Sequence, residues 1–246
     1  MAMRSANPAL NSNTFTGLPA VVSGESMTLQ GTVNKTGVLL LCVFATAAWT
    51  WNQVSATEQV GISIAVGAIG GLIFGLVTTF KQSWAPVTAP IYALLEGLVI
   101  GGLSALLELR FPGIAMQAAG LTFGTLACLL LAYRSGLVRA TENFKLGVVA
   151  ATGGVALVYF VSMIMGLFGH TIPFIHDSGM IGIGFSLLVI GIAAMNLVLD
   201  FDFIESGARQ GAPKYMEWYA AFGLMVTLIW LYIEMLRLLS KLRSRR

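Results

Sequence analysis

The chain has 246 residues, of which 57% are hydrophobic and only 10% are charged. A typical soluble domain carries about 25% charged residues, so this composition argues against an ordinary soluble enzyme. The net charge of +3 does not indicate a nucleic-acid-binding protein either, because the basic residues are few and scattered. The composition is typical of a protein whose main partner is a lipid bilayer.

Charged residues divide the chain into long uncharged intervals of similar length. The uncharged intervals cover residues 36–57, 59–80, 111–133, 146–176 and 178–199. A helix needs about 20 apolar residues to cross a bilayer core about 30 Å thick, so almost every interval matches one crossing. Glu96 interrupts a sixth apolar run and a seventh lies near the C-terminus, which together predict an all-α, polytopic bundle of seven transmembrane helices.

The predicted spans, in chain order, are residues 36–55, 59–80, 87–107, 112–133, 146–168, 179–201 and 216–238. They divide the chain into a polar N-terminal cytoplasmic tail (1–35), a transmembrane domain (36–238) and a basic C-terminal tail (239–246). On the second span, Gly67, Gly71 and Gly75 repeat every four residues, which predicts close contact with a neighbouring helix.

The distribution of lysine and arginine indicates the orientation. Basic residues gather in the N-terminal segment and in the connections 81–86, 134–145 and 202–215, whereas the alternate connections contain only Arg110. Because basic residues favour the cytoplasmic side, we expect a cytoplasmic N-terminus and, after seven crossings, an external C-terminus. The basic C-terminal tail conflicts with that side, and an incomplete last crossing is the alternative.

Four carboxylates in or beside the spans are candidates for an ion-binding or pH-sensing site. They are Glu96 in the third span, Asp200 and Asp202 at the end of the sixth, and Glu217 at the start of the seventh. With the expected orientation, all four could converge on one vestibule open to the cytoplasm. Membrane-embedded acids usually face a cavity, a partner or a pathway. Such a group could change protonation near neutral pH or bind a hard cation.

Each of these acids also has a structural interpretation. Glu96 could be a neutral or hydrogen-bonded acid inside the bundle, and Asp200 could mark the membrane boundary. Asp202 and Glu205 could be solvated charges at the interface. Glu217 could interact favourably with the N-terminal dipole of the last helix.

Two supporting residues are suggested by helical spacing. Asn196 lies one turn before Asp200 and could donate a hydrogen bond to its carboxyl group. Glu234 lies three residues before Arg237, a spacing at which the two side chains form a surface ion pair on a helix.

No motif for metal binding or catalysis is evident. His170, His176 and Asp177 resemble a metal trio but lack a fourth ligand and helical spacing. The sequence contains no P-loop, H-E-x-x-H or G-x-S-x-G pattern. We therefore expect no enzyme activity, no catalytic residue and no resident metal or cofactor.

Several segments resemble the Bax inhibitor-1 (TMBIM) family of membrane proteins. They are the run Tyr92-Ala93-Leu94-Leu95-Glu96-Gly97-Leu98, the Leu199-Asp200 end of the sixth span, and the leucine-rich final span with Arg237. The segments Arg4-Ser5-Ala6-Asn7-Pro8-Ala9-Leu10, Met27-Thr28 and Lys35-Thr36 look like the bacterial branch of that family, which implies a multi-pass protein of the bacterial inner membrane.

The resemblance implies seven helices with the last at the centre of the bundle. It also implies a pH-sensitive calcium leak controlled by an aspartate pair on the last two helices. Asp200 occupies the first aspartate position, and an ungapped alignment places Thr227 at the second, whereas a shifted alignment would offer Glu234. The second span also lacks the basic residue that members of the family can carry there. Glu217 is then a substitute partner for Asp200.

Three functions follow as hypotheses. The first is a cation leak, with Ca²⁺ as the permeant ion, gated by carboxylates near Asp200. The second is a regulator without transport activity, because some bacterial members of the family restrain a membrane-anchored ATP-dependent protease; its candidate binding surface is the polar tail over residues 1–30. The third is a proton-coupled carrier, which would show concentrative uptake.

Overall fold

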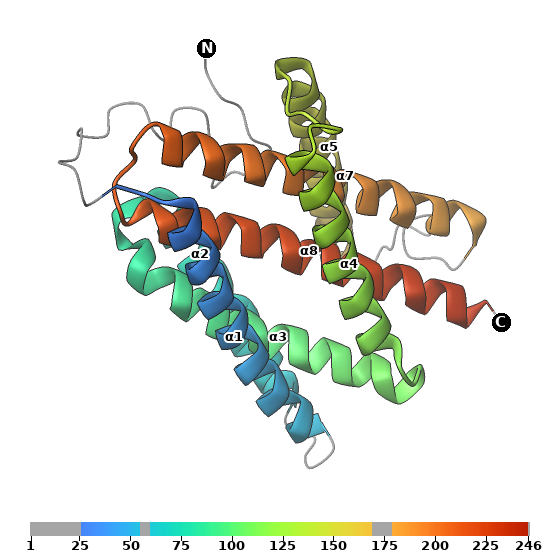
Figure 1. Cartoon of the computed structure of the whole chain (residues 1–246). Helices are drawn as coiled ribbons and strands as arrows, with labels where there is room; N and C mark the ends of the chain where they lie inside the picture. The colour runs from blue at the N-terminus through green and yellow to red at the C-terminus, as the bar shows by residue number, and fades with distance from the viewer. Residues whose placement is uncertain (1–25, 55–59, 169–178, 246) are drawn as a thin grey trace.

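Seven long helices make up the computed structural model, which describes residues 26–54, 60–168 and 179–245 (Figure 1). In chain order they are α1 (Leu29–Val54), α2 (Val60–Phe80), α3 (Ala85–Arg110), α4 (Ile114–Arg134), α5 (Glu142–Leu167), α7 (Met180–Arg209) and α8 (Met216–Ser244). A short 3₁₀ helix, η2 (Gln82–Trp84), precedes α3. All seven long helices are long and apolar enough to cross a membrane, which confirms the predicted multi-pass, all-helical fold.

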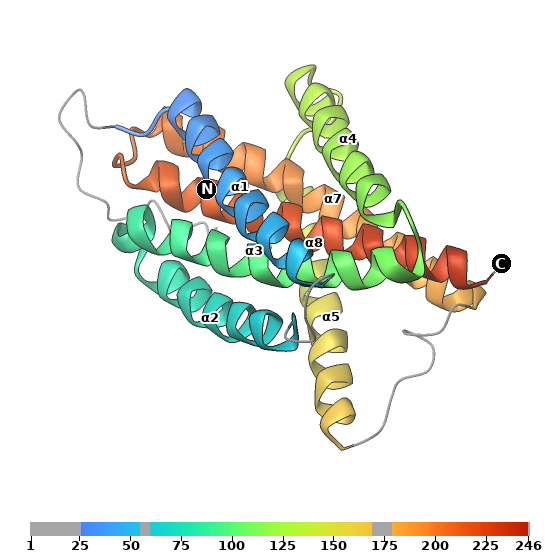
Figure 2. The same ribbon diagram turned by 90° about the horizontal axis from the view of Figure 1, so that it is seen from below.

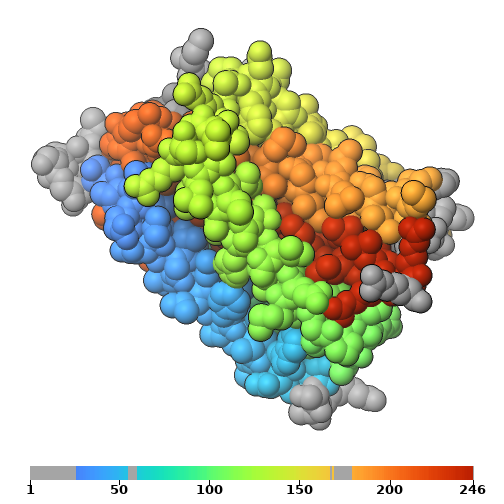
Figure 3. Space-filling model, turned by 45° about the vertical axis from the view of Figure 1, so that its right-hand side comes forward, coloured from blue at the N-terminus to red at the C-terminus, as the bar shows by residue number. Residues whose placement is uncertain are grey.

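Helix α8 lies at the centre of the bundle, as predicted. Helices α7, α1, α4 and α3 all pack against it (Figures 1 and 2), and Ala220, Met225 and Leu231 on α8 are completely buried. Figure 3 shows α4 crossing the front of the molecule, between α1 and α7, with the C-terminal part of α8 reaching the surface. The large side chains of α8 therefore contact protein, whereas those of α2 mostly face outward.

Small residues allow α1 and α2 to approach α3 closely. A Cβ atom at Gly67 would lie 2.6 Å from the Leu95 carbonyl oxygen, and one at Gly75 would lie 3.2 Å from the Tyr92 ring. A Cβ atom at Gly97 would overlap the Thr46 hydroxyl of α1. The tight packing predicted from the glycine repeat of α2 is confirmed, and its partner is α3.

Three helices extend at least six residues beyond their predicted ends. Helix α1 begins at Leu29 instead of residue 36, because the Thr28 hydroxyl accepts a hydrogen bond from the Gly31 amide (2.9 Å) and caps the first turn. The polar tail therefore ends at Thr28. Helix α7 continues to Arg209 and α8 to Ser244, since polar side chains in these extensions find partners on other helices.

Candidate functional site

The antiparallel pairing of α7 and α8 determines how deep in the bundle each acid on these two helices lies. At one end the Lys241 ammonium donates hydrogen bonds to the Gly182 carbonyl (3.0 Å) and the Ser186 hydroxyl (2.9 Å). At the other end a short connection joins the helices. Because the two helices are antiparallel, each residue further along α7 lies opposite a residue one position earlier in α8. Asp200 therefore lies at the level of about residue 225 of α8.

Asp200 on α7 is completely buried, and α7 packs against the central helix α8. Thr227 lies about two residues from the level of Asp200 and is also buried, with its hydroxyl donating to the Gly223 carbonyl at 3.3 Å. The side chain of Asp200 therefore lies inside the protein and not at an exposed membrane boundary. The hairpin register places a carboxylate and a hydroxyl at nearly the same depth in the centre of the bundle.

Glu217 joins the start of α8 to the start of α1. Its completely buried carboxylate accepts hydrogen bonds from the Thr28 amide (3.0 Å) and hydroxyl (2.8 Å). It also pairs with Lys35 at 3.3 Å and Lys214 at 2.8 Å. Glu217 lies about 12 Å along α8 from the level of Asp200, at about 1.5 Å per residue. The structure thus separates these two predicted site residues.

Glu96 is half-buried on the side of α3 that faces α2. A Cβ atom at Gly71 of α2 would lie 3.0 Å from its carboxylate, and the Tyr92 hydroxyl interacts with that carboxylate. The Tyr92 ring in turn packs edge-on against Phe222 of α8, with 5.0 Å between ring centroids. Glu96 is therefore linked to α8 through Tyr92 and is directed at α2, so Glu96, Glu217 and Asp200 occupy three separate positions.

Helix α5 carries a row of three polar residues that the sequence analysis missed. Lys145, Thr152 and Tyr159 are spaced seven residues apart, a spacing that places them along one face of a helix. We call them the α5 polar row. Their regular spacing within a mainly apolar helix is the signal that could have revealed them.

Each member of the α5 polar row contacts a polar side chain on α7 or α8. Lys145 pairs with Asp202 at 2.9 Å, and the Thr152 hydroxyl accepts a hydrogen bond from the Asn196 amide at 2.8 Å. The Tyr159 hydroxyl donates to Glu234 at 2.8 Å. The row therefore attaches α5 to the rest of the bundle at three levels.

These contacts change the interpretation of Asn196. Its amide nitrogen donates to the Thr152 hydroxyl and to the Ile192 carbonyl (2.9 Å). Both amide hydrogens are thus used by acceptors other than the Asp200 carboxyl group. Asn196 connects α7 to α5, although helical spacing predicted a contact with Asp200.

Glu234 forms the predicted i,i+3 pair with Arg237, at 3.0 Å. The prediction that this pair lies on the surface was wrong, because the Glu234 side chain is only 1% exposed. Tyr159 covers the carboxylate and contacts the Arg237 guanidinium, which lies 4.9 Å from the centre of the Tyr159 ring. Glu234 lies about 14 Å along α8 from the level of Asp200.

Asp202 and Glu205, interpreted from the sequence as solvated charges, both have protein partners. Asp202 is bound by Lys145 and retains 19% side-chain exposure. Glu205 accepts a hydrogen bond from the Tyr133 hydroxyl (2.7 Å) and lies 3.6 Å from Arg209. These contacts support the last turns of α7 beyond its apolar part.

Within the described ranges, no group of three histidine, cysteine, aspartate or glutamate side chains is arranged to hold a metal ion. His170, His176 and Asp177 lie outside those ranges, as do residues 1–25 of the polar tail. The candidate site therefore consists of Asp200 on α7 and Thr227 on α8, which are buried at nearly the same depth. Glu217 and Glu234, which have basic partners, lie on either side of that depth along α8.

Comparison with known proteins agrees with this architecture. A family model described as Bax inhibitor 1 like matches residues 7–244, which is nearly the whole chain. The chain belongs to the Bax inhibitor-1 family. No curated protein and no solved structure matches it.

Membership in the Bax inhibitor-1 family directs attention to the last two helices. The family resemblance implied an aspartate pair there, and in this chain Asp200 occupies the first position and Thr227 the second. The hairpin register brings these two residues of this Bax inhibitor-1 protein to nearly the same level, whereas Glu234 and Glu217 lie on either side of it.

Proposed function

We propose that this Bax inhibitor-1 family protein is a pH-sensitive cation leak, with Ca²⁺ as the permeant ion, controlled at Asp200. The observation that supports this proposal is the complete burial of Asp200 on α7, the helix that pairs with the central helix α8. Carboxylate and hydroxyl oxygens are suitable ligands for Ca²⁺, and Asp200 and Thr227 supply one of each. Protonation of Asp200 removes a charge from this contact and shifts the packing of the two helices.

The ion pairs of Glu217 and Glu234 lie on either side of the level of Asp200 along α8 and keep these positions fixed. Glu217 is held by Lys35 and Lys214 at one end of α8, and Glu234 is held by Arg237 toward the other. Glu217 thereby joins the start of α8 to α1, and Glu234, through the Tyr159 hydroxyl, joins a later part of α8 to α5. Removing one partner of a buried ion pair strongly destabilises a protein, so these contacts hold α8 in place on both sides of the level of Asp200. A change of charge at Asp200 then acts on the segment between them. Glu96 has a supporting role in this proposal.

The test is Ca²⁺ flux through purified protein in liposomes loaded with a Ca²⁺ indicator, measured on both sides of neutral pH. Asp200→Asn should remove the pH dependence of the flux. Asp202→Asn is the matched control, because it makes the same chemical change two residues away, and it should keep the pH dependence. Equal flux from wild type and Asp200→Asn at every pH would refute the proposed control at Asp200.

Thr227 provides a second test of the same site. Thr227→Val keeps the shape of the side chain and removes the hydroxyl oxygen, so it should weaken inhibition of the flux by competing divalent cations. Thr122→Val is the control, since Thr122 is also buried and donates to a carbonyl of its own helix at 2.8 Å. Identical responses of the two variants would argue against Thr227 as an ion ligand.

A second function, the regulation of a membrane-anchored ATP-dependent protease, is favoured by the attachment of the segment that follows the polar tail. The Met27 amide donates to the Ala212 carbonyl at 2.6 Å, and Thr28 binds Glu217. A protein bound to the tail would thus act close to the α7–α8 connection. Deleting residues 2–25 should abolish capture of such a protease while Ca²⁺ flux continues; retained capture would contradict this alternative.

A further inference from the structure

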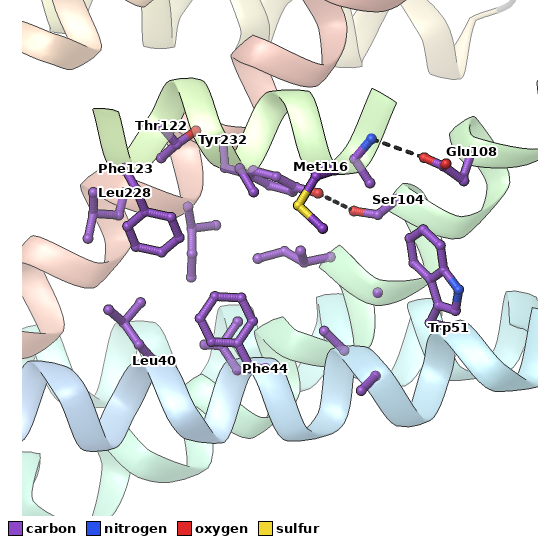
Figure 4. A pocket seen from close by; sticks show the side chains of 18 of the residues that line it. Leu40, Phe44, Trp51, Ser104, Glu108, Met116, Thr122, Phe123, Leu228 and Tyr232 are labelled. Carbon is purple, nitrogen blue, oxygen red and sulfur yellow. Dashed lines mark hydrogen bonds between the residues drawn. The ribbon is translucent and has the colours of Figure 1, made fainter. Parts of the chain in front are cut away.

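An apolar groove runs between α1 and α4, with α3 and α8 forming its base. It has a volume of about 520 Å³. Figure 4 shows Leu40, Phe44 and Trp51 along its α1 side and Met116 and Phe123 along its α4 side. Phe44 is 51% exposed and Met116 is 79% exposed, so the groove is open at the surface of the bundle, where the apolar flank of a transmembrane helix meets lipid.

The polar side chains that line the groove already have partners within the protein. The Ser104 and Tyr232 hydroxyls hydrogen-bond to each other at 2.7 Å, and the Thr122 hydroxyl donates to the Ala118 carbonyl. Glu108 accepts hydrogen bonds from the Gly113 and Ala115 amides at the start of α4. The groove therefore presents mainly hydrocarbon to a ligand, and water inside it would find few polar partners.

The length of the groove matches one leaflet of a bilayer. Leu40 and Trp51 are 11 residues apart on α1, which corresponds to about 16 Å along the helix. Half of a bilayer core about 30 Å thick is about 15 Å. The Trp51 end also carries Asn52 and Glu108, and tryptophan favours the boundary between lipid and water. The groove thus extends from that boundary toward the middle of the bilayer.

The length and lining of the groove favour a hydrocarbon chain as its occupant. The groove extends over about one leaflet, and its lining is almost entirely apolar. An extended acyl chain is the membrane component with that length and that chemistry.

We propose that this groove binds one acyl chain of a phospholipid from the leaflet on the side of the α3–α4 connection. The chain lies between α1 and α4, its end near Leu40 and Leu228, and the lipid headgroup lies near Trp51, Asn52 and Glu108. This lipid site is independent of the proposed ion leak, because it rests on the shape and polarity of the groove and not on Asp200.

Photolabelling tests the proposal. The protein is reconstituted with a phospholipid that carries a diazirine on one acyl chain, illuminated, digested and mapped by mass spectrometry. Ala119→Phe places a ring in the groove, since Ala119 lines it, whereas Ala68→Phe makes the same change on the exposed face of α2. Labelling of groove residues should fall about tenfold in Ala119→Phe, because losing the burial of as few as two methylene groups weakens binding by that factor. It should not fall in Ala68→Phe.

A second measurement uses the unmodified protein and needs no stable variant. A diazirine near the headgroup should label residues close to Trp51, and one near the chain end should label residues close to Leu40. Labelling no stronger than at Leu131, which is 69% exposed on another part of α4, would show only bulk lipid and overturn the proposal. Cross-linking of two protein copies through Met116→Cys would identify a second copy as the occupant and would also overturn it.

Discussion

Thr28 donates two hydrogen bonds to one oxygen of Glu217, from its amide at 3.0 Å and from its hydroxyl at 2.8 Å. The two residues are 189 positions apart in the sequence, and they connect the first turn of α1 to the first turn of the central helix. The same hydroxyl accepts from the Gly31 amide, so Thr28 both starts α1 and fixes it to α8.

Replacing Thr28 should loosen this junction. Thr28→Val removes the helix cap and one hydrogen bond to a buried charge, which should lower the free energy of unfolding by about 1–3 kcal/mol. The measurement is denaturant unfolding of the purified protein in mixed micelles. Thr125→Val is the control: its exposed hydroxyl only donates to the Leu121 carbonyl of its own helix, so its stability should be unchanged. Equal effects of the two variants would contradict the proposed role of the junction.

Gly31 should be intolerant of any side chain. A Cβ atom there would overlap the Glu217 carboxylate, which its partners Thr28, Lys35 and Lys214 hold in place. Gly31→Ala should therefore lower the melting temperature. Gly37→Ala, on the same helix, meets no atom within 4 Å and should leave stability unchanged or raise it by up to about 1 kcal/mol. A melting temperature of Gly31→Ala that matches that of Gly37→Ala would show that the carboxylate can move away at little cost.

The α5 polar row predicts a local effect of Tyr159→Phe. This substitution removes the hydroxyl that contacts both Glu234 and Arg237, which should cost about 1–3 kcal/mol. Hydrogen exchange should increase in α5 more than in α1. Tyr215→Phe is the control, because burial raises the pKa of Tyr215 but its hydroxyl makes no hydrogen bond within the described residues. Unchanged exchange in α5 would mean that the apolar contacts of this helix are sufficient to hold it.

The close approach of α1 and α3 depends on Gly97. Gly97→Ala places a methyl group against the Thr46 hydroxyl and the Val43 backbone, and overpacking of this kind costs about 1–3 kcal/mol. Gly120→Ala on α4 meets nothing within 4 Å and serves as the control. Thermal unfolding should separate the two variants, and coincident unfolding curves would show that α1 shifts to accept the methyl group.

The number and type of the helices were predictable, because the thickness of the bilayer fixes the length of an apolar helix. The charges at Lys81 and Arg134 therefore mark the approximate positions of turns, whereas Lys35 lies inside α1. The extension of α7 to Arg209 was not predictable in the same way. It depends on contacts such as Lys145 with Asp202, which join residues far apart in the sequence.

The candidate site, like the fold, was only partly predictable from the sequence. The spacing of Glu234 and Arg237 predicted their pairing, since both are on one helix, but the burial of Glu234 depends on Tyr159, which lies 75 residues away. The side-chain amide of Asn196 could donate a hydrogen bond to either Thr152 or Asp200, and nothing in the sequence favoured Thr152. The levels of Asp200, Glu217 and Glu234 became clear only from the register of the α7–α8 pair.

The central position of α8 has a consequence for biosynthesis. Of the seven long helices, it leaves the ribosome last, yet α1, α3, α4 and α7 all pack against it. Until Met216 and the residues after it enter the membrane, the faces of these four helices that pack against α8 have no partner. Assembly of the core must therefore wait until α8 has been synthesised, and a chain truncated before α8 would leave those faces uncovered.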